Sequence, residues 1–483
     1  MLKGSLLLGL IASAPAALGQ PAPVLPAPVS RPPASSAPVL PEPDRDPLRV
    51  DFGADPILRL SRTQSPRVPF RNAIAAAVAN HPQTLEQVAL ADEARAVLEE
   101  AEARTLPSID LTVTSYRVLA RDFSNDPDNI IERSRSRQRT DAIAGINYTL
   151  FDFGAGGQRI AAAGARLRAA AADTESGADR VALAAVASWY DVFAYRALVA
   201  VSAAFIEDQQ DLRRDVEARV RAGVSAEGDV AQVDSFIAGA NTRLAEFRRV
   251  LANAEARYTE LIGAPPPAML ARAPIPDVGP MSRDAAALAA MTSPAARAAQ
   301  AVADAAREEA RAARSDRYPQ VSVGVDAGRY GVIETARDYD VRARVTVRQR
   351  FFGGVDARVR QVAARARASD ARATRVRDEA ARDAAIAWSD IAALEQQLVS
   401  LQENYIASRQ SRDVLVERFS NSRGTLFDVA SAQNSYFSTA AAYIRTLTEL
   451  DAARYVLLSR TGTLLPALGI DTAGYTPGER GGK

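Results

Sequence analysis

The chain has 483 residues, no cysteine, and a formal charge of +1 from 59 basic and 58 acidic side chains. This even balance gives no support for nucleic-acid binding, and a chain without cysteine has neither disulfides nor thiolate metal ligands. The length would suit two or three ordinary domains, but the helical pattern described below favours one elongated body.

Residues 1–19 have the pattern of a secretory signal peptide. Lys3 precedes an apolar run over residues 6–12, and small residues lead up to Gln20. That run is shorter than the ~20 apolar residues of a membrane-spanning helix, and no later segment of that length is free of charge. We therefore expect an exported protein without a transmembrane helix. Without cysteine, it cannot be a lipoprotein acylated on an N-terminal cysteine.

Residues 20–69 form an N-terminal extension that starts with a proline-rich segment. The part over 20–47 is rich in Pro, Ala, Ser and Val. This composition cannot build a core and favours an extended, polyproline-like chain. We expect a spacer, and a partner-binding arm is the alternative.

The pattern over residues 70–104 is helical, with a break expected at Asn80-His81-Pro82 because proline interrupts a helix. His81 is the only histidine of the chain. We interpret it as a turn residue, because one histidine without cysteine makes a poor metal site.

Two pairs of alternating segments predict β-hairpins. The first pair covers 109–113 and 142–151 on either side of a charged loop over 121–139, and the second covers 321–325 and 341–348. Strands of ~9–11 residues with one apolar and one polar face are typical of a transmembrane β-barrel. A sheet packed on a water-soluble core would show the same alternation, so the strands alone leave both possibilities open.

The helices favour the barrel. Residues 157–221 and 354–418 contain no proline and almost no glycine, which predicts two helices of roughly 100 Å each. Helices of that length pack side by side in a coiled-coil-like array. Shorter helices are expected over 229–261, 428–459 and 283–314, with a linker over 264–282 and a frayed tail over 471–483.

The chain repeats itself at an interval of 199 residues. Phe153-Gly154 recurs as Phe352-Gly353, Trp189 as Trp388, and Asp229-Val230 as Asp428-Val429. Internal repeats largely fix an architecture, so we expect two tandem structural repeats, over 70–263 and 283–470.

The chain carries an ordered set of short motifs, which are Asn80-His81-Pro82, Leu106-Pro107-Ser108, Phe151-Asp152-Phe153-Gly154, Arg221-Ala222-Gly223-Val224, Tyr318-Pro319-Gln320, Phe351-Phe352-Gly353-Gly354 and Arg423-Gly424-Thr425-Leu426-Phe427-Asp428. In this order they resemble the TolC-like family of outer-membrane efflux and secretion channel proteins over nearly all of residues 70–470.

The resemblance implies a mixed α/β membrane protein. It would be a homotrimer in the outer membrane, in which each protomer gives four strands to a 12-stranded barrel that continues as an α-helical coiled-coil tunnel through the periplasm. Four strands cannot close a barrel alone, and open strand edges are not tolerated in lipid. The valines would then face lipid, and Arg342, Arg344 and Arg348 would line the lumen.

In this family the two helix-to-helix turns form the periplasmic tip and dock a periplasmic adaptor (membrane fusion protein). The matching residues are Gly223, Val224, Ser225, Ala226, Ser422, Arg423, Gly424 and Thr425. The alternative is that glycine only permits a tight reversal of the chain.

The family also closes its channels at this tip with acidic and basic groups. Asp229 and Asp428 match the acids, and Arg423 is the candidate basic partner, whereas acids this close to a helix start also serve as ordinary caps. The family pattern has a second acid where this chain has Ser431, and an aromatic hydroxyl where it has Phe419. We therefore expect the gate to be closed by different contacts.

The second tip resembles the branch that serves type I protein secretion, in which an inner-membrane ABC transporter drives export through the adaptor. Small-molecule efflux with a proton-driven transporter is the alternative. A third possibility, a filamentous periplasmic scaffold, explains the helices but not the hairpins. An enzyme is not expected, because the sequence has no nucleophile–base pair or metal cluster, and Gly154-Ala155-Gly156-Gly157 lacks the spacing of a nucleotide-binding loop. No cofactor or metal is expected.

Overall fold

The structure is a computed structural model, and it describes residues 39–44, 51–120, 136–279, 281–334 and 338–471. All of them belong to the unit that runs from Ala37 to Lys483. The expected signal peptide, most of the proline-rich segment, residues 121–135 of the charged loop and nearly all of the C-terminal tail lie outside the described residues.

The elements follow the duplicated order predicted from the sequence. Before and within the first repeat they are α1 (Pro56–Arg59), α2 (Arg67–Asn80), α3 (Pro82–Ala103), β1 (Ser108–Arg117), β2 (Gln138–Phe151), α5 (Ala155–Arg221) and α6 (Glu227–Ile262). The second repeat has α7 (Arg283–Ala290), α8 (Pro294–Ser315), β3 (Gln320–Tyr330), β4 (Asp338–Arg348), α9 (Val355–Ser420) and α10 (Leu426–Arg460), and the short α11 (Leu464–Leu468) follows it.

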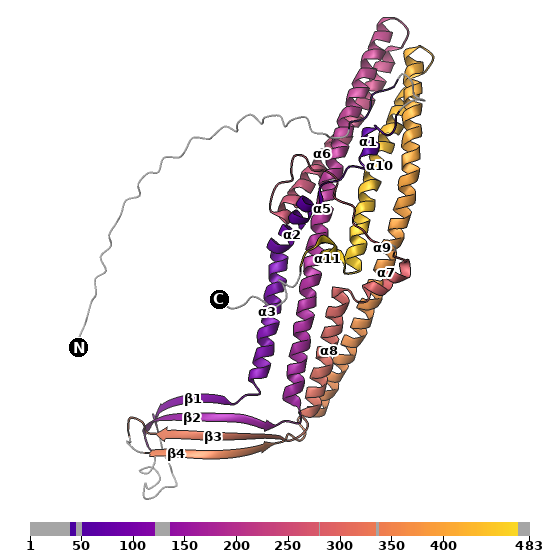
Figure 1. The fold of residues 1–483 in the computed structure, drawn as a ribbon. Coiled ribbons are helices and arrows are strands. Elements are labelled where there is room, and N and C mark those ends of the chain that lie inside the picture. Colours follow the sequence, from indigo (N-terminus) through magenta and orange to yellow (C-terminus); the bar gives the residue numbers. More distant parts are fainter. Residues whose placement is uncertain (1–38, 45–50, 121–135, 280, 335–337, 472–483) are drawn as a thin grey trace, which may run out of the picture. The chain divides into compact units, whose positions relative to one another are not determined.

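The helices pack side by side in a fixed order. Helix α3 packs on α5, α5 on α8, and α8 on α9, while α6 pairs with α5 and α10 pairs with α9. Helix α10 also packs on α5, which joins the two repeats. The four strands lie together at the end of this array that is opposite the α5–α6 and α9–α10 turns (Figure 1).

The strands form one antiparallel sheet in the order β1-β2-β3-β4. Its central pairing, β2 with β3, joins the hairpins of the two repeats, with Ile146 opposite Val325. Strands β1 and β4 are the edges, so each leaves one row of backbone groups without a partner within the protomer.

The chain passes from strand to long helix through left-handed residues. Phe153 and Gly154 have φ values of 55° and 83°, and Phe352 and Gly354 have values of 63° and 82°. A left-handed phenylalanine is sterically unfavourable, so its recurrence in both repeats shows that the junction itself requires this geometry.

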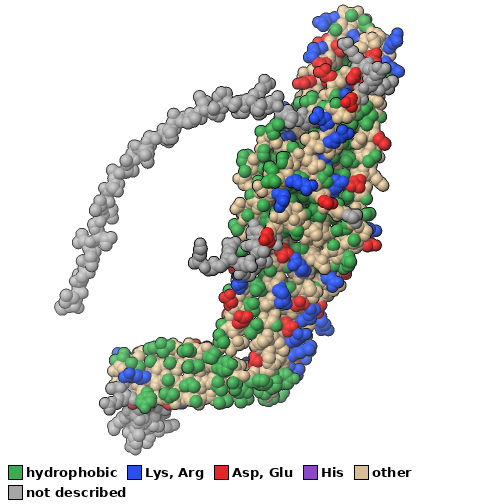
Figure 2. Space-filling view, in the orientation of Figure 1, with side chains coloured by type: hydrophobic (Ala, Val, Ile, Leu, Met, Phe, Trp, Pro, Cys, Tyr) green, Lys and Arg blue, Asp and Glu red, His purple; other side chains and the backbone are tan. Residues whose placement is uncertain are grey.

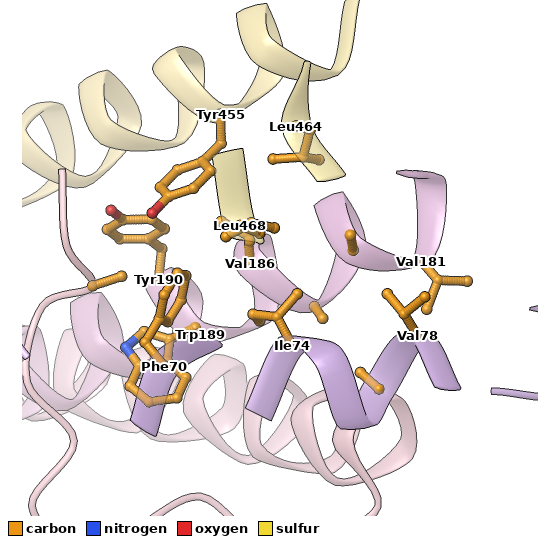
Figure 3. Close-up of a cluster of buried hydrophobic side chains, with 14 of the residues drawn as sticks. Phe70, Ile74, Val78, Val181, Val186, Trp189, Tyr190, Tyr455, Leu464 and Leu468 are labelled. Atoms are coloured by element: carbon orange, nitrogen blue, oxygen red, sulfur yellow. The ribbon is translucent and has the colours of Figure 1, made fainter. Parts of the chain in front are cut away.

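The largest apolar cluster lies where α2, α5, α10 and α11 meet (Figure 3). The ring of Phe70 packs edge-on against Trp189, with centroids 5.2 Å apart. The indole nitrogen of Trp189 donates to the Ala271 carbonyl at 2.9 Å, and that of Trp388 donates to the Met281 carbonyl at 2.7 Å. Each repeat therefore uses its one tryptophan to fasten the segment between the repeats, because a buried indole N–H needs an acceptor.

The predicted helices agree with the structure except at one position. The break at His81 is confirmed, and His81 caps α3 by accepting from the Gln83 amide through Nδ1 at 3.2 Å. The single helix expected over 283–314 is wrong, because the chain breaks between Ala290 and Pro294. Proline starts a helix readily but disfavours helical backbone at the residue before it.

The expectation that residues 20–47 contribute nothing to a core is also wrong at one residue. Leu40 is only 3% exposed and belongs to the cluster around α5, α9 and α10. Among the described residues, α5 alone is long and apolar enough to cross a membrane by length and composition, and 67% of that apolar window is buried against other parts of the protein.

Candidate functional site

One face of the sheet carries a network of polar side chains. Arg342 pairs with Asp340 at 2.9 Å and donates to the Tyr330 hydroxyl at 3.0 Å. Arg344 pairs with Asp326 across the sheet at 3.3 Å. Arg348 extends the same face and is exposed. The three predicted lumen arginines therefore share one face, and cross-strand contacts position two of them.

The other face of the sheet is apolar and uncovered. Its exposed fractions reach 63–75% at Ile109, Leu111, Val113, Val341, Val345 and Val347, and apolar side chains dominate the view of the strands in Figure 2. A contiguous surface of this kind marks contact with lipid or protein. Together with the polar opposite face, it fits a sheet that separates lipid from a water-filled lumen.

Both tips end their long helices with the same backbone motif. The amides of Gly223 and Val224 donate to the carbonyls of Val220 and Arg219 at 3.0 and 2.9 Å. The amides of Ser422 and Arg423 donate to Phe419 and Arg418 at the same two distances. These paired bonds are the Schellman arrangement, which needs a left-handed residue after the helix.

The left-handed residue differs between the two tips. In the first it is Gly223, with φ of 72°, and in the second it is Ser422, with φ of 61°. Gly424 therefore does not supply the left-handed residue of the second reversal. A Cβ there would lie 3.2 Å from the Phe419 amide nitrogen, so Gly424 serves the close approach of two backbones.

The two predicted gate acids both cap a helix. The Asp229 carboxylate accepts from the Ala226 amide at 3.2 Å. The Asp428 carboxylate accepts from the Thr425 hydroxyl at 2.7 Å, and the Asp428 amide donates back to that hydroxyl at 3.2 Å. No ion pair links Arg423 to either acid within the described part of the chain. A gate role for these three residues stays a prediction.

A residue that the sequence did not single out connects the two tips. Arg219, at the end of α5, donates to the Phe419 carbonyl and to the Ser422 hydroxyl, the latter at 3.1 Å. Its guanidinium also lies 4.1 Å from the centroid of the Phe419 ring, within the range of a cation–π interaction. Phe419, where a hydroxyl was expected, therefore links the helices through its ring and its carbonyl.

Further links join the two helix pairs behind the tips. Gln209 of α5 donates to Gln433 of α10 at 2.8 Å, and both side chains are buried. Arg243 of α6 donates to Asn434 at 3.0 Å. An apolar cluster of Leu212, Val216, Val233, Phe419 and Val429 lies between these links and the tips.

Sequence reasoning could not find Arg219 or Gln209, since their partners lie about 200 residues further along the chain. The interval of 199 residues would place Arg219 beside Arg418 in an alignment of the repeats, but it gives no sign that the first residue reaches across to the second tip.

The sequence of this chain matches the model of the family described as outer membrane efflux protein over residues 73–264 and 286–463. The chain belongs to the outer membrane efflux protein family. It is 25% identical over 353 residues to outer membrane efflux protein BepC of Brucella suis, an alignment that covers 71% of this chain and 76% of that protein.

Solved structures show the same fold. VceC of Vibrio cholerae has a TM-score of 0.71 at 15% identity, covering 82% of this chain and 96% of VceC. The CmeC outer membrane channel of Campylobacter jejuni also has a TM-score of 0.71, at 13% identity, covering 89% of this chain and 95% of CmeC.

Membership of the outer membrane efflux protein family settles the architecture and the location. The protein is a non-enzymatic outer-membrane efflux channel, a trimer in which four strands per protomer build a 12-stranded barrel. Its helices form the periplasmic tunnel, and channels of this family dock with periplasmic adaptors and inner-membrane transporters.

Proposed function

We propose that this channel is the outer-membrane duct of a type I protein secretion system. The observation that carries the proposal is the second tip, where Arg423-Gly424-Thr425-Leu426-Phe427-Asp428 resembles the secretion branch. In the structure this stretch presents an exposed surface, with the Phe427 side chain 74% exposed.

The protein supplies no energy in this proposal. An inner-membrane ABC transporter drives the polypeptide, and the channel gives it a continuous path from the adaptor to the exterior. Docking of the adaptor on Gly223–Ala226 and Ser422–Thr425 shifts the tip from a closed to an open population, because a ligand favours the state that it binds more tightly. Gly223 and Val224 are exposed, as an adaptor surface requires.

The other parts of the chain have the following proposed roles. Residues 1–19 direct export, and residues 20–69 precede the two repeats as an extension. Arg342, Arg344 and Arg348 line the lumen of the barrel, where they keep a wide polar duct hydrated without selecting one substrate.

The culture-supernatant proteome of a deletion strain, compared with its parent and with a complemented strain, tests the proposal. We expect the loss of one or a few large secreted proteins and their return on complementation. An unchanged supernatant contradicts type I secretion.

Small-molecule efflux is the second candidate, and the similarity to BepC, named an efflux protein, supports it. In that case the deletion strain keeps its supernatant proteome and becomes more sensitive to drugs and dyes. Both readouts come from the same pair of strains, so one experiment separates the two candidates.

A further inference from the structure

A short segment before the first repeat lies across the second helix pair. It consists of residues 39–44 and 51–62, and we call it the strap. The strap contains helix α1, and its side chains Leu40, Ile57 and Leu58 are at most 7% exposed. They join a cluster with residues of α5, α9 and α10, among them Leu198, Tyr405 and Tyr436.

The first polar attachment of the strap is Asp55. Its fully buried carboxylate caps α1 by accepting from the Ile57 and Leu58 amides at 2.8 and 3.1 Å. The same carboxylate accepts from Arg409 of α9 at 2.5 Å and from the Tyr405 hydroxyl at 3.0 Å. The Tyr405 hydroxyl in turn meets that of Tyr436 at 2.9 Å, so one carboxylate connects the strap to both α9 and α10.

The second attachment is Arg272, from the segment between the repeats. It pairs with Asp451 of α10 at 2.8 Å, and the two side chains are 2% and 0% exposed. The remaining guanidinium nitrogen donates to the backbone carbonyls of Leu60 and Ser61 in the strap, the latter at 2.5 Å. The strap thus completes the hydrogen bonding of a buried ion pair.

The third attachment is Arg412 of α9. Its Nη1 donates to the Pro41 carbonyl at 3.0 Å, and its guanidinium lies 4.5 Å from the centroid of the Tyr436 ring. Arg412 also pairs with Asp413 at 2.6 Å, with neither side chain exposed. A buried charge is costly unless it is paired and hydrogen-bonded, so these charges depend on the strap remaining in place.

The chemistry of α9 under the strap differs from that of an ordinary core helix. Beyond Ile391, the buried residues of α9 are Tyr405, Ser408, Arg409, Arg412, Asp413 and Phe419. Most of this surface is polar. Hydrogen bonds to water can replace polar contacts when helices separate, whereas an exposed apolar surface has no such compensation.

We propose that the strap is a built-in restraint on opening. It shares an apolar cluster with α5 through Leu40, Ile57 and Leu58, and Asp55 attaches it to α9 and, through Tyr405, to α10. One of these two attachments must therefore loosen when the second pair moves away from the first. The inference uses the proposed channel function only for its electrical readout, and the docking of the strap can be followed without it.

The test compares Asp55→Asn with Asp51→Asn in the purified full-length trimer. Asp51 lies in the same strap, is exposed, and among the described residues its carboxylate accepts from the Gly53 amide alone, at 2.8 Å, so it is a matched control. Tyr405→Phe is a milder second variant that keeps the ring and removes only the hydroxyl. Hydrogen–deuterium exchange reports docking, and planar-bilayer recordings report opening.

We expect Asp55→Asn and Tyr405→Phe to raise amide exchange in residues 57–62 and 405–413 and to increase the open-to-closed ratio. Roughly a tenfold increase is expected for Asp55→Asn, the size produced by losing one hydrogen bond to a charged group. Asp51→Asn should match the unsubstituted trimer in both measurements.

Faster exchange without a change in opening overturns the proposal, because the strap would then be structural only. Unchanged exchange in both variants overturns it as well. If Asp55→Asn does not assemble, which heat-modifiable gel mobility reveals, Tyr405→Phe decides between the same outcomes. A failure of type I secretion would appear only in the supernatant proteome and leaves this result intact.

Discussion

The two long helices have nearly equal lengths and duplicated positions, yet they are buried very differently. In the protomer, thirty of the 67 residues of α5 are buried, against eleven of the 66 residues of α9. Helix α5 packs on α3, α6, α8 and α10, whereas α9 lies at the edge of the array. Duplication therefore copied the element but not its environment.

The difference in burial between α5 and α9 shows how the long helix of a duplicated repeat can be held in place in two different ways. Helix α5 buries alanines, valines and aromatic residues along most of its length, so apolar packing fixes it. Toward its tip, α9 is fastened by arginines that reach the strap and α10. Helix α5 is thus the frame, whereas the part of α9 near its tip is held by contacts that a change of charge can break.

The largest effect is expected where a buried ion pair fastens α10. Arg272→Ala removes the closer partner of the fully buried Asp451 carboxylate and leaves it only the longer contact with Arg454 at 3.5 Å among the described residues, which should cost about 3–5 kcal/mol of unfolding free energy. Urea unfolding of the trimer at a fixed protomer concentration measures this loss of unfolding free energy. Arg297→Ala breaks an ion pair with Glu175 in which the arginine is 51% exposed, and should cost less than about 1 kcal/mol. An equal loss of unfolding free energy in the two variants would contradict the larger contribution assigned to the buried Arg272–Asp451 pair.

A smaller effect is expected at the link between the tips. Arg219→Ala removes two hydrogen bonds and a cation–π contact to the second tip, worth roughly 1–3 kcal/mol together. We expect higher conductance of the reconstituted channel, because the two pairs separate more easily. Arg213→Ala is the control, since in the described part of the chain Arg213 pairs with Glu217 and Asp234 of its own helix pair and with no other acid. A wild-type conductance for Arg219→Ala would show that this link does not restrain the tips.

Charge reversal at the second tip should act more weakly. Asp428→Arg removes a helix cap worth about 0.5–2 kcal/mol, and Arg423→Glu changes an arginine that pairs with neither predicted gate acid. We expect both variants to raise conductance in bilayer recordings. Unchanged conductance in both would remove Asp428 and Arg423 from the gate.

An effect of similar size, seen only in the pH dependence of stability, concerns a carboxyl group on the frame helix. Burial, chiefly, raises the pKa of Asp208 to about 6, while Arg412 opposes the shift. The folded state therefore binds the proton more tightly than the unfolded state, and stability falls as pH rises from about 4 to about 6. Asp208→Asn should remove this loss and raise stability at pH 7.5 by about 1–2 kcal/mol.

Urea midpoints at pH 4 and pH 7.5 check this expectation. The exposed Asp215 on the same helix gives the control Asp215→Asn, which should follow the unsubstituted trimer at both pH values. A gain for Asp208→Asn that is equal at the two pH values would contradict the assigned titration.

Local patterns predicted most of the architecture because they depend on neighbours in sequence. Proline at position 82, the alternation over 341–348 and the absence of proline in the long helices are each sufficient for their element. The two tips were also located, since each follows the end of a long helix.

The long-range polar contacts could not be predicted. Asp55 finds Arg409 at a separation of 354 residues, and Arg219 finds Ser422 at 203. Nothing in the composition around Asp55 distinguishes it from Asp51, because only the folded helices decide which carboxylate is buried. Proline chemistry alone predicts the break before Pro294, but the alanine-rich helical pattern continues across this position and hides it.

The unpaired edges of β1 and β4 have a genetic consequence. Because the barrel closes only when three protomers supply their strands to one another, a subunit with a damaged edge spoils every trimer that it enters. Under equal co-expression with the unaltered gene, only about one trimer in eight would consist entirely of sound subunits. Mutations at these edges should therefore behave as dominant alleles, whereas mutations in the interior of α5 that prevent folding should be recessive.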